Sequence, residues 1–199
     1  ARHGNPHVIP PHNVNYQANI WALHNIGVTT IIAVNAVGGI SKLQDTGVIS
    51  LPHQLIDYTW GRQHSFSNTA EFPLLHIDFS HPYTATVRQT LLQVADSEQL
   101  SVLDGAVYAV TQGPRLETAA EIQRLHKDGC DIVGMTAMPE AALAKELALD
   151  YTCIALVVNK AAGLSDELIT FSAMEKVMHE GMHQIKHLIA AYCKHLASR

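Results

Sequence analysis

The sequence predicts a three-layer α/β domain, because apolar strands alternate with helices along the whole chain. The strongest strand signals are two runs rich in β-branched residues, Val28–Gly39 (VTTIIAVNAVGG) and Cys153–Asn159 (CIALVVN). The strongest helix signal is an amphipathic stretch from Ser172 to Ala197. The 199 residues contain no internal repeat, low-complexity tract or linker, so we expect one domain over residues 1–199.

The first predicted helix covers residues 14–26, with Asn13 as its N-cap and Gly27 after its end. Its apolar residues recur on one face: Val14, Ala18, Trp21, Ala22 and Ile26. The strand from Val28 follows at once and is expected to end in Asn35, Ala36 and the Gly38–Gly39 pair. Glycines there let backbone N–H groups converge on an anion, most commonly a phosphate.

The remaining elements continue the alternation. Residues 56–66 are expected to form a loop, and Gly105–Val110 a short strand. Thr118 is expected to cap a helix over residues 119–128, with Gly129 past its end, and to form a capping box with Glu121, while Pro139 suits the first turn of the next helix. The final helix should bury one face, made of Val177, Ile185, Leu188, Ile189 and Tyr192.

Composition restricts the class of protein. Hydrophobic residues make up 47% of the chain and the mean hydropathy is +0.06, which is typical of a compact soluble protein. The net charge of −5 argues against a general nucleic-acid or anionic-membrane surface. No signal peptide or membrane span is visible, and three widely spaced cysteines predict reduced thiols in the cytoplasm.

Several candidate ligand-binding residues stand near predicted strand ends, where open α/β sheets gather their ligands. Arg2 and His3 suit a phosphate dianion, although they also fit an exposed polar terminus. Glu117 can accept an N–H from a heterocycle, while Met135 and Thr136 place a thioether and a hydroxyl before a helix. Ordinary structural explanations also exist: Asn35 to Gly39 can be a tight turn without a ligand, the segment after Glu117 is a capping box, and Met135 alone fits plain core.

A metal hypothesis comes from His179-Glu180-Gly181-Met182-His183, which matches the H-E-x-x-H zinc-peptidase pattern on a helix. The extended pattern with a third histidine is absent, since His187 follows only four residues after His183. We therefore expect no metal, and these histidines more simply form a solvated stripe opposite the apolar face of the final helix.

Six motifs in one order carry a resemblance that covers essentially the whole chain: RHGNPH, VNYQANIWAL, NAVGGI, QGPRLET, GMTAMPEAALAKEL and ALVVN. Together they resemble the trimeric purine nucleoside phosphorylase and methylthioadenosine phosphorylase family, most closely its bacterial branch acting on S-methyl-5'-thioinosine. The resemblance implies an α/β/α fold with a mixed central sheet. It begins after the family's first strand and Gly-rich phosphate loop, so we expect a preceding N-terminal portion to complete the phosphate site.

The resemblance also implies roles for individual residues. Phosphate would be held by Arg2, His3, Ala36 and Thr136, with Asn35 supporting that turn. Met135 would lie by the ribose hydroxyls, and Asn159 would bond the purine at N7 as the catalytic residue. Inorganic phosphate would be a co-substrate, with no cofactor, and Leu116, Glu117 and Ala161 would complete the base site.

Base choice follows from these positions. An amide at Asn159 and a methyl group at Ala161 suit a 6-oxopurine, because adenine-selective relatives carry an Asp-x-Asp pattern there. Glu117 agrees, because hypoxanthine and guanine present an N1–H donor. Met174 suits a 5'-methylthio group. His76, with His81 as the alternative, matches a position that closes the neighbouring subunit's 5' pocket, which implies a homotrimer.

The sequence therefore predicts phosphorolysis of S-methyl-5'-thioinosine to hypoxanthine and 5-methylthioribose 1-phosphate. Alternatives within the family are inosine, guanosine or methylthioadenosine as substrate. From other classes, a non-catalytic nucleoside-binding protein and a zinc peptidase remain as alternatives.

Overall fold

The computed structural model describes residues 1–68, 72–166 and 168–198. Two short 3₁₀ turns, η1 (Pro11–Asn13) and η2 (Phe66–Asn68), accompany the regular elements. The helices are α1 (Tyr16–Asn25), α2 (Ala85–Ser97), α3 (Ala119–Lys127), α4 (Glu140–Glu146) and α5 (Phe171–Ala197). The strands are β1 (Thr30–Gly39), β2 (Ile49–Leu51), β3 (Gln54–Asp57), β4 (Leu103–Asp104), β5 (Val107–Val110), β6 (Ile132–Gly134) and β7 (Asp150–Lys160).

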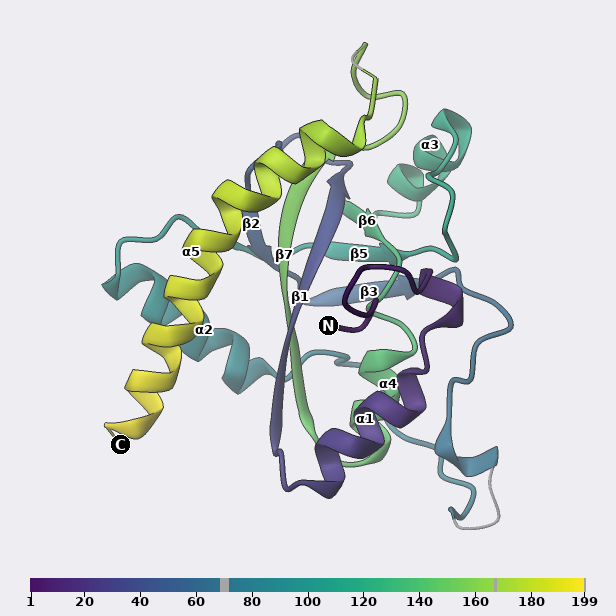
Figure 1. The fold of residues 1–199 in the computed structure, drawn as a ribbon, viewed down its shortest axis with the longest axis vertical. Coiled ribbons are helices and arrows are strands. Elements are labelled where there is room, and N and C mark those ends of the chain that lie inside the picture. The colour runs from purple at the N-terminus through teal and green to yellow at the C-terminus, as the bar shows by residue number, and fades with distance from the viewer. Residues whose placement is uncertain (69–71, 167, 199) are drawn as a thin grey trace.

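The strands form one mixed sheet in the order β3-β5-β6-β1-β7-β2-β4. Its two long central strands, β1 and β7, run parallel, while β1 pairs antiparallel with β6 only through Gly38 and Gly39. Figure 1 shows these two strands crossing the middle of the molecule. The edge of β1 before Gly38 is therefore open toward the N-terminal segment, and this opening positions the site.

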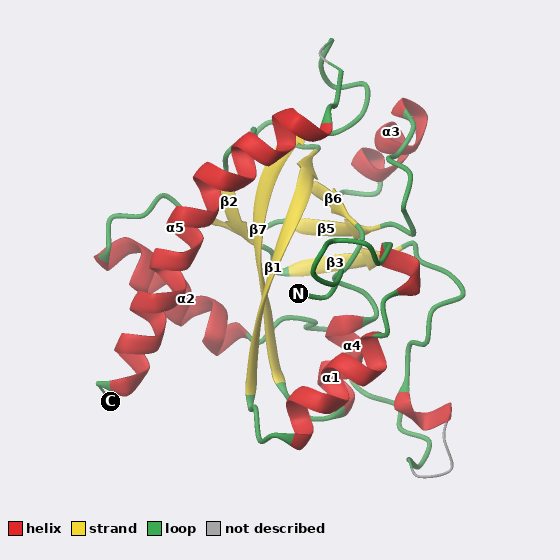
Figure 2. Cartoon of the chain, viewed as in Figure 1, coloured by secondary structure: helices red, strands yellow, loops and turns green. Residues whose placement is uncertain are grey.

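Helices cover both faces of the sheet, as Figure 2 shows. Along β7, alternate side chains enter different cores: Cys153 and Ala155 pack with α1 and α4, whereas Ile154 and Leu156 pack with α2 and α5. A third cluster joins α3 to β5 and β6. This period-two alternation confirms the predicted three-layer α/β/α architecture with a mixed sheet.

Several predicted elements are confirmed. Thr118 caps α3 through a complete capping box with Glu121. The final helix buries the predicted face, because Ile185, Leu188 and Tyr192 are in the core and Val177 and Ile189 pack against it. The α2 helix was not predicted, although its buried residues Val87, Leu91 and Val94 follow helical spacing.

The prediction for the first helix was wrong in two respects. Asn13 ends a 3₁₀ turn, and it is Asn15 whose side chain accepts the N–H of Ala18 at 3.0 Å and caps α1. The buried face consists of Tyr16 and Ile20. Of the predicted face, Val14 is buried just before the helix. Because α1 lies against α4 at one side of the sheet, the other four predicted residues are exposed: Ala18, Trp21, Ala22 and Ile26.

The predicted strand ends also need correction. Asn35 and Asn159 lie within β1 and β7, and both strands continue to Gly39 and Lys160. The register shifts between Val37 and Gly38, which places Gly38 opposite Asn159. Pairing between the two strands carries them past the polar residues, and it brings two candidate site segments side by side.

Candidate active site

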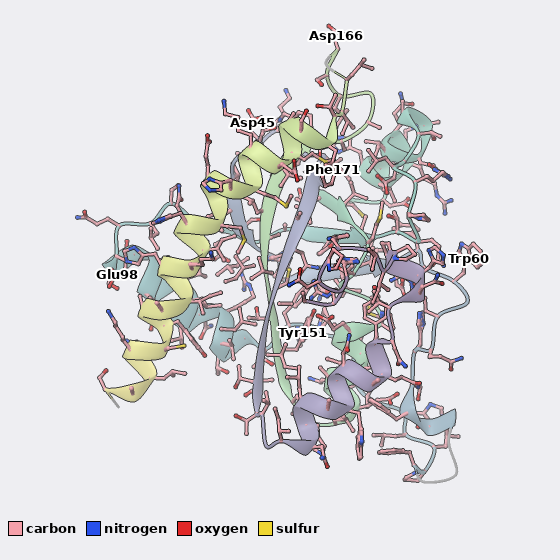
Figure 3. The ribbon with its side chains drawn as sticks, in the orientation of Figure 1. Asp45, Trp60, Glu98, Tyr151, Asp166 and Phe171 are labelled. Carbon is pink, nitrogen blue, oxygen red and sulfur yellow. The ribbon has the colours of Figure 1, made fainter. Side chains whose placement is uncertain are left out.

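One cavity of about 740 Å³ opens between the N-terminal segment, the ends of β1, β6 and β7, and the start of α5. Eleven of the twelve residues predicted for the site line it: Arg2, His3, Asn35, Ala36, Leu116, Glu117, Met135, Thr136, Asn159, Ala161 and Met174. Phe171, labelled in Figure 3, marks the end of the cavity formed by α5. The structure therefore brings together residues as distant in the sequence as Arg2 and Met174.

Arg2 and Glu140 form a two-point ion pair at one corner of the cavity. Nε donates to Oε2 at 2.8 Å and Nη2 donates to Oε1 at 2.7 Å, while Nη1 donates to the Val34 carbonyl at 3.3 Å. Burial opposes the charge, but the Glu140 carboxylate outweighs it and raises the pKa of the Arg2 guanidinium above its usual value. Arg2 is thus a fixed cation.

Glu140 is a functional candidate that the sequence argument missed. It is buried in the first turn of α4, and its Oε1 also accepts the hydroxyl of Tyr151 at 2.9 Å. Figure 3 labels Tyr151 in the middle of the molecule. An acidic residue in the first turn of a helix is so common that the sequence offers no separate signal for this role.

His3 completes the charged corner. Its Nδ1 lies 2.8 Å from the Ile9 carbonyl, which requires a hydrogen on Nδ1, and its ring stacks on His7 with centroids 4.5 Å apart. Burial lowers the pKa of the His3 imidazole. The neutral ring with hydrogen on Nδ1 then presents Nε2 as an acceptor, whereas the protonated ring presents a donor.

A buried chain of polar groups lies behind this corner. Asn35 donates through Nδ2 to the Thr136 hydroxyl oxygen at 2.6 Å and accepts the Cys153 thiol through Oδ1 at 3.3 Å. Since both ends of the Asn35 amide are engaged, this side chain fixes Thr136. Ala36 is exposed on β1, and its N–H lies on the same strand edge as the Val34 carbonyl that Arg2 contacts.

A carboxylate and an amide stand at a second end of the cavity. Glu117 accepts the Thr111 hydroxyl at 2.7 Å through Oε1. Asn159 is half-buried and donates through Nδ2 to the carbonyl of Lys160 at 2.6 Å. Ala161 is buried nearby, and Leu116 is partly exposed at the mouth. This end can both donate to and accept from a planar heterocycle.

Between these two ends the cavity wall is apolar and rich in thioethers. Met174, Met178 and Met182 line it from successive turns of α5. Met135 lines it from the segment after β6, and a Cβ on Gly113, whose φ is +63°, would collide with the Met135 sulfur. Flexible thioethers adapt to apolar groups of irregular shape.

His76 is the one predicted site residue outside the cavity. It is exposed in the segment before α2, next to exposed Leu74 and Leu75. His81, the alternative, is also exposed. Within this chain neither side chain lines the cavity.

The H-E-x-x-H pattern lies on α5, with His179, Glu180 and His183 exposed. His187 pairs with Glu98, the Nε2 to Oε2 distance being 2.7 Å. Across residues 1–68, 72–166 and 168–198, no three His, Cys, Asp or Glu side chains are grouped so as to hold a metal ion. In the same ranges no helix has both the length and the apolar character needed to cross a membrane.

The chain is similar to known proteins over nearly its whole length. The model of the phosphorylase superfamily matches residues 1–194. A probable S-methyl-5'-thioinosine phosphorylase of Pseudomonas syringae pv. tomato is 55% identical over 190 residues, which are 96% of this chain and 77% of that protein. The 6-oxopurine nucleoside phosphorylase of Pyrococcus furiosus is 42% identical, over 96% of this chain and 74% of its own length.

Solved structures agree on the fold. The methylthioadenosine phosphorylase of Schistosoma mansoni in complex with adenine superposes with a TM-score of 0.94 at 28% identity, covering 100% of this chain and 76% of that one.

Proposed function

Since this chain belongs to the phosphorylase superfamily, we propose that it cleaves purine nucleosides with inorganic phosphate, and that its substrate is S-methyl-5'-thioinosine. The products are hypoxanthine and 5-methylthioribose 1-phosphate. The observation that carries the proposal is that one cavity joins a cationic corner at Arg2, a thioether wall at Met174 and an amide at Asn159.

The cationic corner suits the phosphate. Arg2 stays charged, the Ala36 N–H and the Thr136 hydroxyl are donors, and His3 can either accept or donate a proton. Asn35 holds Thr136 in place from behind. A phosphate bound here lies below the sugar, so attack on the anomeric carbon needs no diffusional encounter.

The opposite end suits the purine. As the bond between the anomeric carbon and N9 breaks, its electron pair moves onto the base while a phosphate oxygen forms the new C–O bond. Asn159 donates to N7 and stabilises charge that develops only in the transition state. The Asn159 amide nitrogen carries two N–H groups, so one can donate to N7 while the other stays on the Lys160 carbonyl. No covalent enzyme intermediate is involved.

Specificity follows from Glu117 and Met174. The Glu117 carboxylate accepts from Thr111 and suits the N1–H of hypoxanthine, which adenine lacks. The Met174 thioether suits a methylthio group better than a hydroxyl. The names of the relatives support phosphorolysis of 6-oxopurine and methylthio nucleosides alike.

We further propose that the enzyme is a homotrimer in the cytoplasm. Support for the trimer is the exposed position of His76, which a second copy would bring to the 5' end of the cavity, and the exposed Leu74 and Leu75 beside it. Support for the cytoplasm is that Cys130, Cys153 and Cys193 are free thiols.

The test is to incubate the 199-residue protein, and beside it a form that carries the expected preceding N-terminal portion, with S-methyl-5'-thioinosine, with and without phosphate, and to follow hypoxanthine release. Inosine, guanosine and methylthioadenosine are assayed in parallel. Phosphate-dependent release that is fastest with methylthioinosine supports the proposal. Faster turnover of methylthioadenosine contradicts the argument from Asn159 and Glu117, and faster turnover of inosine contradicts that from Met174. Binding without turnover of any of the four indicates a nucleoside-binding protein.

A further inference from the structure

Arg62 donates mainly to backbone carbonyls beside the cavity, and it also donates to the Gln112 side chain at 3.2 Å and the Tyr16 hydroxyl at 3.4 Å. Nη1 donates to the carbonyls of Met135 at 2.8 Å and Met138 at 2.5 Å. Nη2 donates to those of Gln112 at 2.8 Å and Thr111 at 3.2 Å. Arg62 is absent from the cavity lining, so this side chain acts on the walls and has no direct path to a ligand.

The Arg62 guanidinium is held mainly by carbonyl groups, and Asp57 is a nearby carboxylate that favours its charge. Among the described residues Arg62 forms no ion pair, although its guanidinium packs 5.6 Å from the Tyr16 ring centroid. Burial lowers the pKa of Arg62, which means that the surroundings oppose the charge. The four carbonyl bonds offset that cost, and only a planar, forked cation can make them together.

The two walls that Arg62 joins carry different parts of the proposed site. On one wall, Thr111 holds Glu117 at 2.7 Å through its hydroxyl. On the other, Met135 lines the cavity, and Met138 lies two residues before Glu140, the partner of Arg2. Arg62 therefore connects the segment proposed to contact the base with the segment proposed to contact the sugar and the phosphate.

We propose that Arg62 is a positioning residue for phosphorolysis: it sets the separation between the segment that holds Glu117 and the segment that bears Met135 and Thr136. The inference rests on the proposed function. It deepens that function by naming the group that keeps the base contact and the phosphate contact in register. A displacement of about 1 Å between such contacts can cost about 100-fold in rate.

The first variant is Arg62→Lys, which keeps the charge and loses the fork. We expect kcat for methylthioinosine to fall about 100-fold, and KM to change much less, because alignment matters most in the transition state. Arg88→Lys is the matched control. Arg88 likewise donates to a backbone carbonyl, that of Leu51 at 3.2 Å, and pairs with Asp104, but it lies on α2 outside the cavity.

The second variant is Arg62→Ala assayed with guanidinium ion at low concentration. Added guanidinium should restore part of kcat in Arg62→Ala and none in Arg88→Ala, an effect that a loss of folding would not produce. The proposal is supported if Arg62→Lys and Arg88→Lys unfold at the same temperature and only Arg62→Lys loses kcat. Wild-type kcat in Arg62→Lys, or no rescue of Arg62→Ala, overturns it.

A crystal structure of Arg62→Lys tests the positioning role without a measurement of turnover. We expect the Thr111–Gly113 and Met135–Met138 segments to move apart relative to the wild type. Unchanged segments overturn the positioning role even if the protein proves inactive. Inactivity of the wild type toward all four nucleosides, with the segments displaced in the variant, overturns the proposed function alone.

Discussion

Arg2 and Glu140, which are 138 positions apart in the chain, meet in a two-point ion pair of 2.8 and 2.7 Å. Their side chains are only 18% and 7% exposed, so the pair is shielded from water. The carboxylate uses both oxygens on Arg2, and one of them also accepts from Tyr151. Arg2 is thereby held with Nη1 toward the open edge of β1.

Replacing this carboxylate should weaken both folding and phosphate binding. In Glu140→Gln the buried Arg2 charge loses its counter-charge, and we expect the free energy of unfolding to fall by about 3 kcal/mol. Phosphate affinity should fall as the guanidinium loses its orientation. Denaturant titration and calorimetry measure the two effects.

Glu121→Gln is the matched control for Glu140→Gln. Glu121 also pairs with an arginine at two points, Arg115 at 2.8 Å and 2.8 Å, but on the surface, where water screens the pair and it stabilises the fold much less. Equal losses of stability in the two variants would show that the buried Arg2–Glu140 pair stabilises the fold no more than the exposed pair does.

Asn159→Ala should lower kcat by about 100-fold, because it removes a donor that acts on charge developing in the base. Phosphate affinity should stay as in the wild type, since the cationic corner is intact. Steady-state kinetics and phosphate titration test both parts. Lys160→Ala serves as control, because Lys160 follows Asn159 on β7 but its Nζ pairs with Asp45 at 3.2 Å. A fall in kcat as large in Lys160→Ala would remove Asn159 from its assigned role.

Met174→His should shift the 5' preference from methylthioinosine toward inosine, by about 10-fold in the ratio of kcat/KM values, because an imidazole can bond a 5'-hydroxyl. Competition between the two substrates gives this ratio directly. Glu175→His puts the same side chain on the adjacent, exposed position of α5 and should leave the ratio unchanged. An unchanged ratio in Met174→His would mean that other residues form the 5' pocket.

Phosphate binding should take up a proton at His3. Burial lowers the pKa of the free imidazole, and a bound anion favours the imidazolium and raises it. Between those two pKa values binding takes up a proton, so the His3 contribution to affinity grows as pH falls through the bound-state pKa. Calorimetry at about pH 6 in buffers of different ionisation enthalpy measures the uptake.

The phosphate ion itself titrates in this range. The His3 contribution is therefore the difference in proton uptake between the wild type and His3→Gln. Uptake should diminish in His3→Gln and persist in His12→Gln, which alters an exposed histidine of η1. Identical uptake in wild type and His3→Gln would place the proton elsewhere.

Most of the candidate site was predictable, because its residues form short motifs whose chemistry is local. Asn159 and Glu117 are recognisable by type and by their position near strands, and the cavity does gather them with Arg2 and Thr136. Their roles as ligands remain predictions. Glu140 and Arg62 were missed, because each acts on partners far away in sequence and neither belongs to a motif with a chemistry of its own.

The sequence by itself determined the alternation of strands and helices, the capping box of α3 and the buried face of α5, because these depend on residues within a few positions of one another. Only the tertiary structure decided that β1 and β7 continue past their asparagines, that Gly38 lies opposite Asn159, and that Glu140 meets Arg2. Those relationships follow from strand order and register. They arise because hydrogen bonds and packing between distant segments outweigh the local preference of a polar residue to end a strand.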